Sequence, residues 1–174
     1  LMTMATNLIL KAVGNIPNAT NKVFLFNRIL FENLGSSGLP MGQYLDLNYL
    51  KRRLQLEGNR KTHKELIYKK TTTLFNLSFL LSYSLFVEDA NKITTMEKAS
   101  KWFGLAFQIY DDFDDIGQDT DHCSPNIVVK FGRAEAYNQF HKSVNKTLEY
   151  LGQLGIELDF FNEIFDKLKK QVQL

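Results

Sequence analysis

Apolar residues recur at helical spacing along almost the whole chain. One early segment has apolar residues at roughly the i, i+3, i+4 spacing of a helix face, namely Val23, Phe24, Ile29, Leu30 and Leu34. Alternating runs rich in Val, Ile and Thr, which would predict strands, do not occur. The pattern therefore predicts a single all-α domain over residues 1–174, with about seven helices and neither an internal repeat nor a linker.

Glycine, proline and capping residues divide this pattern into segments. Gly14 and Pro17 end the first helix, and Thr62 with Glu65 three residues later forms a capping box that predicts the start of the fourth. Gly117 is expected to end the fifth helix, which begins near Thr94 or Thr95, and a polar loop follows over 118–126. The expected helices are 2–13, about 20–34, 41 to about 56, 63–83, about 95–116, about 130–151 and about 158–172.

Composition excludes several classes of protein. The chain is 44% hydrophobic and 23% charged with a net charge of +2, so we expect a globular domain without nucleic-acid binding. One cysteine, Cys123, excludes an internal disulfide and argues against a zinc cluster. The longest apolar stretch, about 74–86, is interrupted by polar residues and is too short to span a membrane, so we expect this piece to be soluble.

Four aspartates gather at the end of the fifth predicted helix, in the segment 107–115. Asp115 follows Asp111 by four residues and Asp112 by three, so we expect the three carboxylates on one side of the helix, with Gln108 one turn earlier. Like charges repel there, and the negative end of the helix dipole raises the free energy further. A divalent cation would reverse both effects, and hard oxygen ligands favour Mg²⁺. The simpler alternative is a solvated acidic helix end, which the aromatic residues just before it make less favourable.

Two further pairs of residues have the chemistry of a phosphate site. Lys70 stands inside an otherwise apolar helix, where its ammonium group could meet a phosphate while the Thr71 hydroxyl donates to it. Gln43 and Asp46 lie three apart and share a helix face. The alternative for Lys70 is a side chain that extends to solvent. The alternative for Gln43 and Asp46 is an exposed polar stripe on the helix.

In order and spacing these segments resemble the C-terminal half of trans-isoprenyl diphosphate synthases, the polyprenyl synthetase family that includes farnesyl and geranylgeranyl diphosphate synthases. Residues 38–46 resemble the family's "GQ..D" helix start, and Lys70-Thr71 resembles its "KT" pair. Residues 104–115 are similar to its second aspartate-rich motif, "FQ..DD..D".

The resemblance implies an isoprenoid-synthase helical bundle around a central cavity, with the first half of the fold missing here. It implies an Mg²⁺-dependent prenyltransferase that condenses isopentenyl diphosphate with an allylic prenyl diphosphate. Asp111, Asp112 and Asp115 would hold the metal, and Lys70 and Gln108 would be catalytic. The implied substrate-binding residues are Lys70, Thr71, Gln43, Asp46, Gln108 and Lys130. A homodimer through residues 2–13 and 22–34 is also implied, at a cytoplasmic location or at a membrane surface reached through an upstream segment.

The chain departs from the family pattern in ways that keep alternatives open. The first aspartate-rich motif is absent, and Gly117-Gln118 replaces the usual Gly-Lys, so we expect Lys130 to supply the basic group. We therefore expect residues 1–174 to be inactive alone. The alternatives are a catalytically inactive regulatory subunit of a heteromeric synthase, and a terpene cyclase or squalene/phytoene-type synthase.

Overall fold

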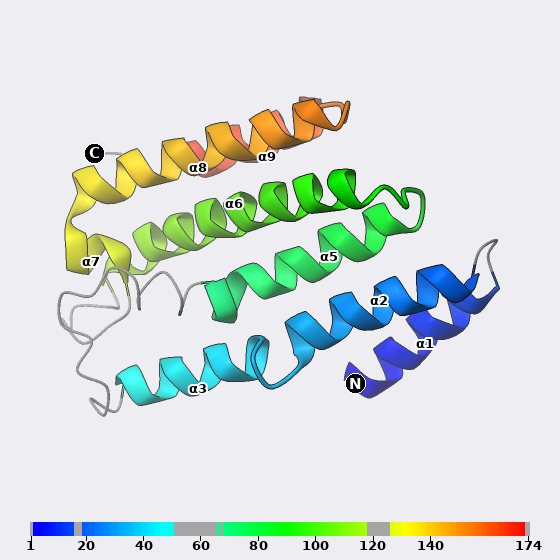
Figure 1. Cartoon of the computed structure of the whole chain (residues 1–174). Helices are drawn as coiled ribbons and strands as arrows, with labels where there is room; N and C mark the ends of the chain where they lie inside the picture. Colours follow the sequence, from blue (N-terminus) through cyan, green and yellow to red (C-terminus); the bar gives the residue numbers. More distant parts are fainter. Residues whose placement is uncertain (1, 16–18, 51–65, 67, 118–125, 173–174) are drawn as a thin grey trace.

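The computed structural model describes residues 2–15, 19–50, 66, 68–117 and 126–172, and over these ranges the chain forms helices and connections but no strand (Figure 1). This confirms the all-α prediction. The helices are α1 (Met2–Gly14), α2 (Ala19–Leu34), α3 (Leu39–Leu50), a π-helical turn (Tyr68–Thr72), α5 (Thr73–Ser84), α6 (Ala90–Asp114), a 3₁₀ turn (Asp115–Gly117), α7 (Ile127–Phe131), α8 (Arg133–Gln153) and α9 (Asp159–Lys169).

The long helices lie side by side in a layered array. Helix α6 is central, because it packs against α5 on one side and α8 on the other. Helix α2 packs on α5 and α1 on α2, so that the first and last helices of the chain lie at opposite edges (Figure 1). The π-helical turn packs against both α3 and α6, which brings three distant segments together.

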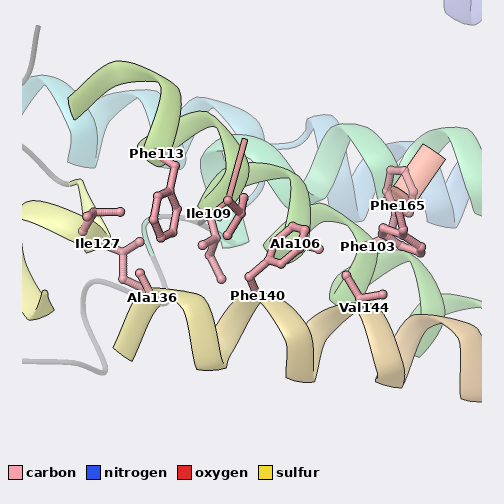
Figure 2. Packing of buried hydrophobic residues seen from close by; sticks show 11 residues of the cluster. Phe103, Ala106, Ile109, Phe113, Ile127, Ala136, Phe140, Val144 and Phe165 are labelled. Carbon is pink, nitrogen blue, oxygen red and sulfur yellow. The ribbon is translucent and has the colours of Figure 1, made fainter. Parts of the chain in front are cut away.

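The main core fills the space between α6 and α8 (Figure 2). Its side chains on α6 recur every three or four residues and meet a matching face of α8, with additions from α7 and α9. They include Phe103, Ala106, Ile109, Phe113, Ile127, Ala136, Phe140, Val144 and Phe165, each at most 7% exposed. Burial of one large apolar side chain stabilises the fold by about 1.5–3 kcal/mol, so this face anchors the central helix.

Helix α6 begins earlier than the sequence pattern predicts. It starts at Ala90 rather than near Thr94, because the Asp89 carboxylate caps it. Asp89 Oδ1 accepts hydrogen bonds from the backbone amides of Asn91 at 2.8 Å and Lys92 at 3.2 Å. Aspartate before a helix is a strong start signal, and it outweighs the later threonines.

The helix predicted over 130–151 is instead two helices, α7 and α8. Gly132 separates them with φ at 85°, a left-handed conformation that glycine adopts most readily. Asn126 caps α7, since its Oδ1 accepts from two backbone amides of the first turn at 2.9 and 3.1 Å.

Helix α6 ends at Asp114 and a 3₁₀ turn continues to Gly117, the residue expected to end the helix. The helix predicted over 63–83 contains the π-helical turn before α5. Helices α1, α2 and α9 match their predicted segments to within three residues at each end. The capping box at Thr62 and Glu65 lies outside the described residues, as does the expected end of the third helix near residue 56. Among the helices that the structure describes, none has the length and apolar character needed to cross a membrane.

Candidate functional site

The π-helical turn presents Lys70 to a carboxylate of α3. Lys70 Nζ lies 3.0 Å from Asp46 Oδ2. Asp46 is only 8% exposed, and its second oxygen, Oδ1, is buried with no hydrogen-bond partner among the described residues. The ammonium group is thus held by a buried anion on one side, while the Lys70 side chain remains 36% exposed on the other.

Thr71, the next residue of the same turn, faces α6 rather than α3. Its hydroxyl donates to Gln108 Oε1. The amide of Gln108 in turn donates from Nε2 to Asp112 Oδ1 at 2.8 Å. The structure therefore joins two of the predicted substrate-binding residues and one predicted metal ligand in a continuous hydrogen-bond relay.

Asp112 does not share the outward face that the sequence spacing predicts for it. The residue is 6% exposed, and its Oδ2 accepts from the backbone amide of Ile127 at 2.7 Å. Its backbone carbonyl accepts from Asn126 Nδ2, also at 2.7 Å. A buried carboxylate is stable only where donors surround it, and the start of α7 supplies one, so Asp112 faces inward and connects α6 to α7.

Asp111 remains at the surface among like charges. Partial loss of hydration raises the pKa of the Asp111 carboxyl above its usual value, and the nearby Asp115 and Asp114 raise it further. Lys70 acts in the opposite direction and lowers this pKa. The end of α6 is thus an acidic cluster at a disfavoured place, with the ammonium of the π-helical turn close enough to influence it.

The donors present fit a magnesium ion that is shared with a phosphate ligand. Among the described residues, no three acidic, histidine or cysteine side chains form a complete metal site. Mg²⁺ needs no complete protein cage, because it commonly takes one or two carboxylates and fills its remaining positions with water and phosphate oxygens. Asp111 in the last turn of α6 and Asp115 at the start of the following 3₁₀ turn, four residues apart, are suited to that arrangement.

The two other predicted binding residues lie at the edges of this group. Gln43 is an exposed residue of α3, about one turn before Asp46. Lys130 is half-buried in the last turn of α7. Asn126, which holds the end of α6 to α7, is a contributor that the motif spacing does not identify. Its signal in the sequence is an asparagine directly before an apolar run, the usual pattern of a helix cap.

Comparisons with known proteins agree with the motifs. Residues 2–128 match the family model for polyprenyl synthetases. Trans-prenyltransferases of African swine fever virus, for example those of isolates Pig/Kenya/KEN-50/1950 and Tick/Malawi/Lil 20-1/1983, are 28% identical over 100 residues. That match covers 58% of this chain and 30% of each viral protein.

Solved structures show the same fold. A geranyltransferase from Legionella pneumophila superposes with a TM-score of 0.78 at 20% identity, over 98% of this chain and 57% of that one. A geranyltransferase from Helicobacter pylori 26695 gives a TM-score of 0.69 at 21% identity, over 94% of this chain and 54% of that one. The chain thus spans just over half the length of these enzymes. With most of its residues matched by the family model, and with a fold that agrees, this chain belongs to the polyprenyl synthetase family.

Proposed function

We propose that the protein takes part in prenyl-chain elongation, as an Mg²⁺-dependent enzyme that condenses isopentenyl diphosphate with an allylic prenyl diphosphate. One observation carries this proposal. Thr71, in the π-helical turn that also carries Lys70, donates to Gln108 of α6, one helical turn before the acidic residues Asp111 and Asp115. A cation and paired carboxylates around one point suit a metal-bound diphosphate, because both charges of such a ligand find a partner.

Each residue then has a defined task. Asp111 and Asp115 would hold Mg²⁺, which would stabilise the negative charge of the departing diphosphate. Lys70 would bind a diphosphate oxygen as a point charge. The Thr71 hydroxyl has a single proton, which it donates to Gln108 Oε1 without ligand, and it would turn from Gln108 to donate to a second diphosphate oxygen. Gln108 orients Thr71, and Asp112 orients Gln108, so that Asp112 supports the site through hydrogen bonds.

An aromatic wall adjoins the acidic end of α6. Phe107 and Tyr110 lie with ring centroids 5.9 Å apart, and Phe107 lies 5.1 Å from Phe75 of α5. Aromatic faces attract cations, and apolar walls exclude water. These rings are therefore suited to shield the allylic cation that forms when the carbon–oxygen bond breaks.

We also propose that the active assembly contains more than residues 1–174. The family resemblance calls for a second acidic motif opposite this one. Without that motif the catalytic rate should fall steeply, because residues that act as a unit lose their effect together. We therefore expect this piece to bind Mg²⁺-diphosphate without making product. The proposed homodimer would form through α1 and α2, whose exposed apolar residues include Leu8, Phe24 and Phe31.

The test is incubation of the complete gene product with labelled isopentenyl diphosphate, each allylic primer and Mg²⁺, with the products sized by chromatography. A longer prenyl diphosphate that depends on Mg²⁺ and is lost in Asp111→Ala would support the proposal. Absence of elongation with every primer would contradict it. Release of diphosphate from the allylic substrate without isopentenyl diphosphate would favour a cyclase instead.

A further inference from the structure

The π-helical turn is packed unusually closely against α3 at Gly42. A Cβ atom at this position would lie 2.4 Å from the carbonyl carbon of Lys69 and 2.5 Å from the backbone nitrogen of Lys70. These neighbours are backbone atoms, which cannot move aside as a flexible side-chain end can. Glycine at this position therefore fixes how closely α3 approaches the turn.

A second glycine sets the approach from the opposite side. A Cβ atom at Gly104 of α6 would lie 2.9 Å from Thr72 Cα, 3.0 Å from its Oγ1 and 3.1 Å from its Cβ. The turn from Tyr68 to Thr72 thus lies between two helices, and each helix contacts it through a glycine. Turns of π-helix are often found at functional sites, and this one carries both Lys70 and Thr71.

Each glycine governs one of the contacts that orient the site. Helix α3 carries Asp46, the partner of Lys70 at 3.0 Å, so a shift between α3 and the turn changes where the ammonium group points. Helix α6 carries Gln108, the partner of Thr71, so a shift between α6 and the turn separates the hydroxyl from its acceptor.

Further contacts keep the turn from adjusting freely. Lys69 Nζ donates to the backbone carbonyl of Ser37 at 2.6 Å, and Thr73 Oγ1 donates to the carbonyl of Lys69 at 2.8 Å. The backbone next to Gly42 is thus held from two directions. An added methyl group would change the separation of α3 and the turn more readily than the internal shape of the turn.

We propose that Gly42 and Gly104 are positioning residues of the diphosphate site, which set Lys70 and Thr71 at the distance from Asp111 that a metal-bound diphosphate requires. The inference rests on the proposed function, because it assumes that Lys70 and Thr71 bind this ligand. Displacement of a group in an active site by about 1 Å can lower the reaction rate about a hundredfold. A single methyl group at either glycine should therefore weaken diphosphate binding measurably.

The test compares Gly42→Ala and Gly104→Ala with Gly152→Ala in α8, where the nearest atom to the new Cβ is Leu158 Cδ1 at 4.0 Å. Calorimetric titration measures the affinity of each folded variant for inorganic diphosphate at saturating Mg²⁺, and separately for Mg²⁺ alone. We expect Gly42→Ala and Gly104→Ala to bind diphosphate about tenfold or more weakly. Their affinity for Mg²⁺ alone should stay near that of the parent, and Gly152→Ala should match the parent with both ligands.

A rescue variant separates positioning from a general loss of structure. Thr72→Gly removes two of the three atoms nearest to the new Cβ, so adding it to Gly104→Ala should recover part of the diphosphate affinity. This pair also keeps the proposal testable if Gly42→Ala does not fold.

Three results would overturn the inference. Diphosphate affinity equal to that of the parent in both glycine variants would remove the inference and leave the proposed function standing. An equal loss of affinity for diphosphate and for Mg²⁺, which Thr72→Gly does not restore, would show that the glycines have a merely structural role. A parent chain that binds no diphosphate with Mg²⁺ would remove the proposed function and this inference together.

Discussion

Lys70 and Asp46 form an ion pair of 3.0 Å between the π-helical turn and α3, in which the carboxylate is buried and the ammonium group is partly exposed. The pair holds the cation in place in the absence of a ligand. A binding group that is already ordered loses less entropy when the ligand binds, so the pair prepares Lys70 for an anion at the end of α6.

Loss of the Lys70 charge should weaken diphosphate binding, and it should also lower the stability of the fold because the buried Asp46 carboxylate loses its cation. A charge-assisted hydrogen bond contributes about 1.5–3 kcal/mol, so Lys70→Met should lower the affinity for diphosphate with Mg²⁺ by roughly ten- to a hundredfold. Lys167→Met is the control, because Lys167 pairs with the exposed Glu163 on α9, which is not part of the proposed site. Calorimetry that shows equal affinity in both variants would contradict the role of Lys70.

Asp112 should matter for stability more than an exposed aspartate does. In Asp112→Asn the new amide group faces the backbone amide of Ile127 or the amide of Gln108, so one buried donor loses its acceptor. Such a loss costs about 1–3 kcal/mol, and the urea midpoint should fall accordingly. Asp114→Asn, at an exposed position of the same helix end, is the control, and an equal midpoint in the two variants would exclude the proposed connection between α6 and α7.

Asp111 should make stability depend on pH in a defined direction. Its pKa is raised in the folded state, so its stabilising contribution is complete below the usual carboxyl range and is lost as the pH rises through the folded pKa. In metal-free buffer at pH 7, Asp111→Asn should therefore be more stable than the parent by about 0.2–0.5 kcal/mol, the typical effect of one like-charge pair on a helix.

The difference between Asp111→Asn and the parent should disappear as the pH falls below the ordinary aspartate pKa of about 3.9, where the carboxyl is protonated in both the folded and the unfolded chain. Glu163→Gln is a control of opposite sign, because the hydrogen bond from Lys167 lowers the pKa of the Glu163 carboxyl. Urea titrations at several pH values would measure both variants. A loss of stability in Asp111→Asn at neutral pH without metal would contradict the electrostatic description of the site.

The proposed homodimer predicts that charges on α2 will separate the subunits. Phe24 and Phe31 are 72% and 77% exposed and lie seven residues apart on one face of α2. Phe31→Glu should give a monomer by light scattering, because a charge in an apolar interface is costly. Phe160→Glu is the control, since Phe160 is similarly exposed but lies on α9. A parent that is itself monomeric would contradict the homodimer.

The sequence predicts the helices well where local signals decide them. Periodicity identifies α6, and the order and spacing of the motifs are enough to group Lys70, Thr71 and Gln108 in one site. The structure brings Thr71 and Gln108 together through a hydrogen bond, and their role as binding residues stays a prediction.

Contacts between distant segments could not be predicted in the same way. Helical spacing placed Asp112 beside Asp111, but the amide of Ile127, fifteen residues later, draws its carboxylate inward. The close approach of Gly42 to the π-helical turn likewise depends on how three helices pack. Spacing along one helix carries no information about either contact.

The most direct test of the central claim is the melting temperature with and without Mg²⁺ and diphosphate. A ligand that binds only the folded state at about a hundred times its dissociation constant adds about 2.7 kcal/mol of stability. For a domain of this size that is a rise of about 5–10 °C. We predict this rise in the parent when Mg²⁺ and diphosphate are present together, and its loss in Asp111→Ala. A rise of the same size in Asp111→Ala, or none in the parent, would contradict the assignment of the site.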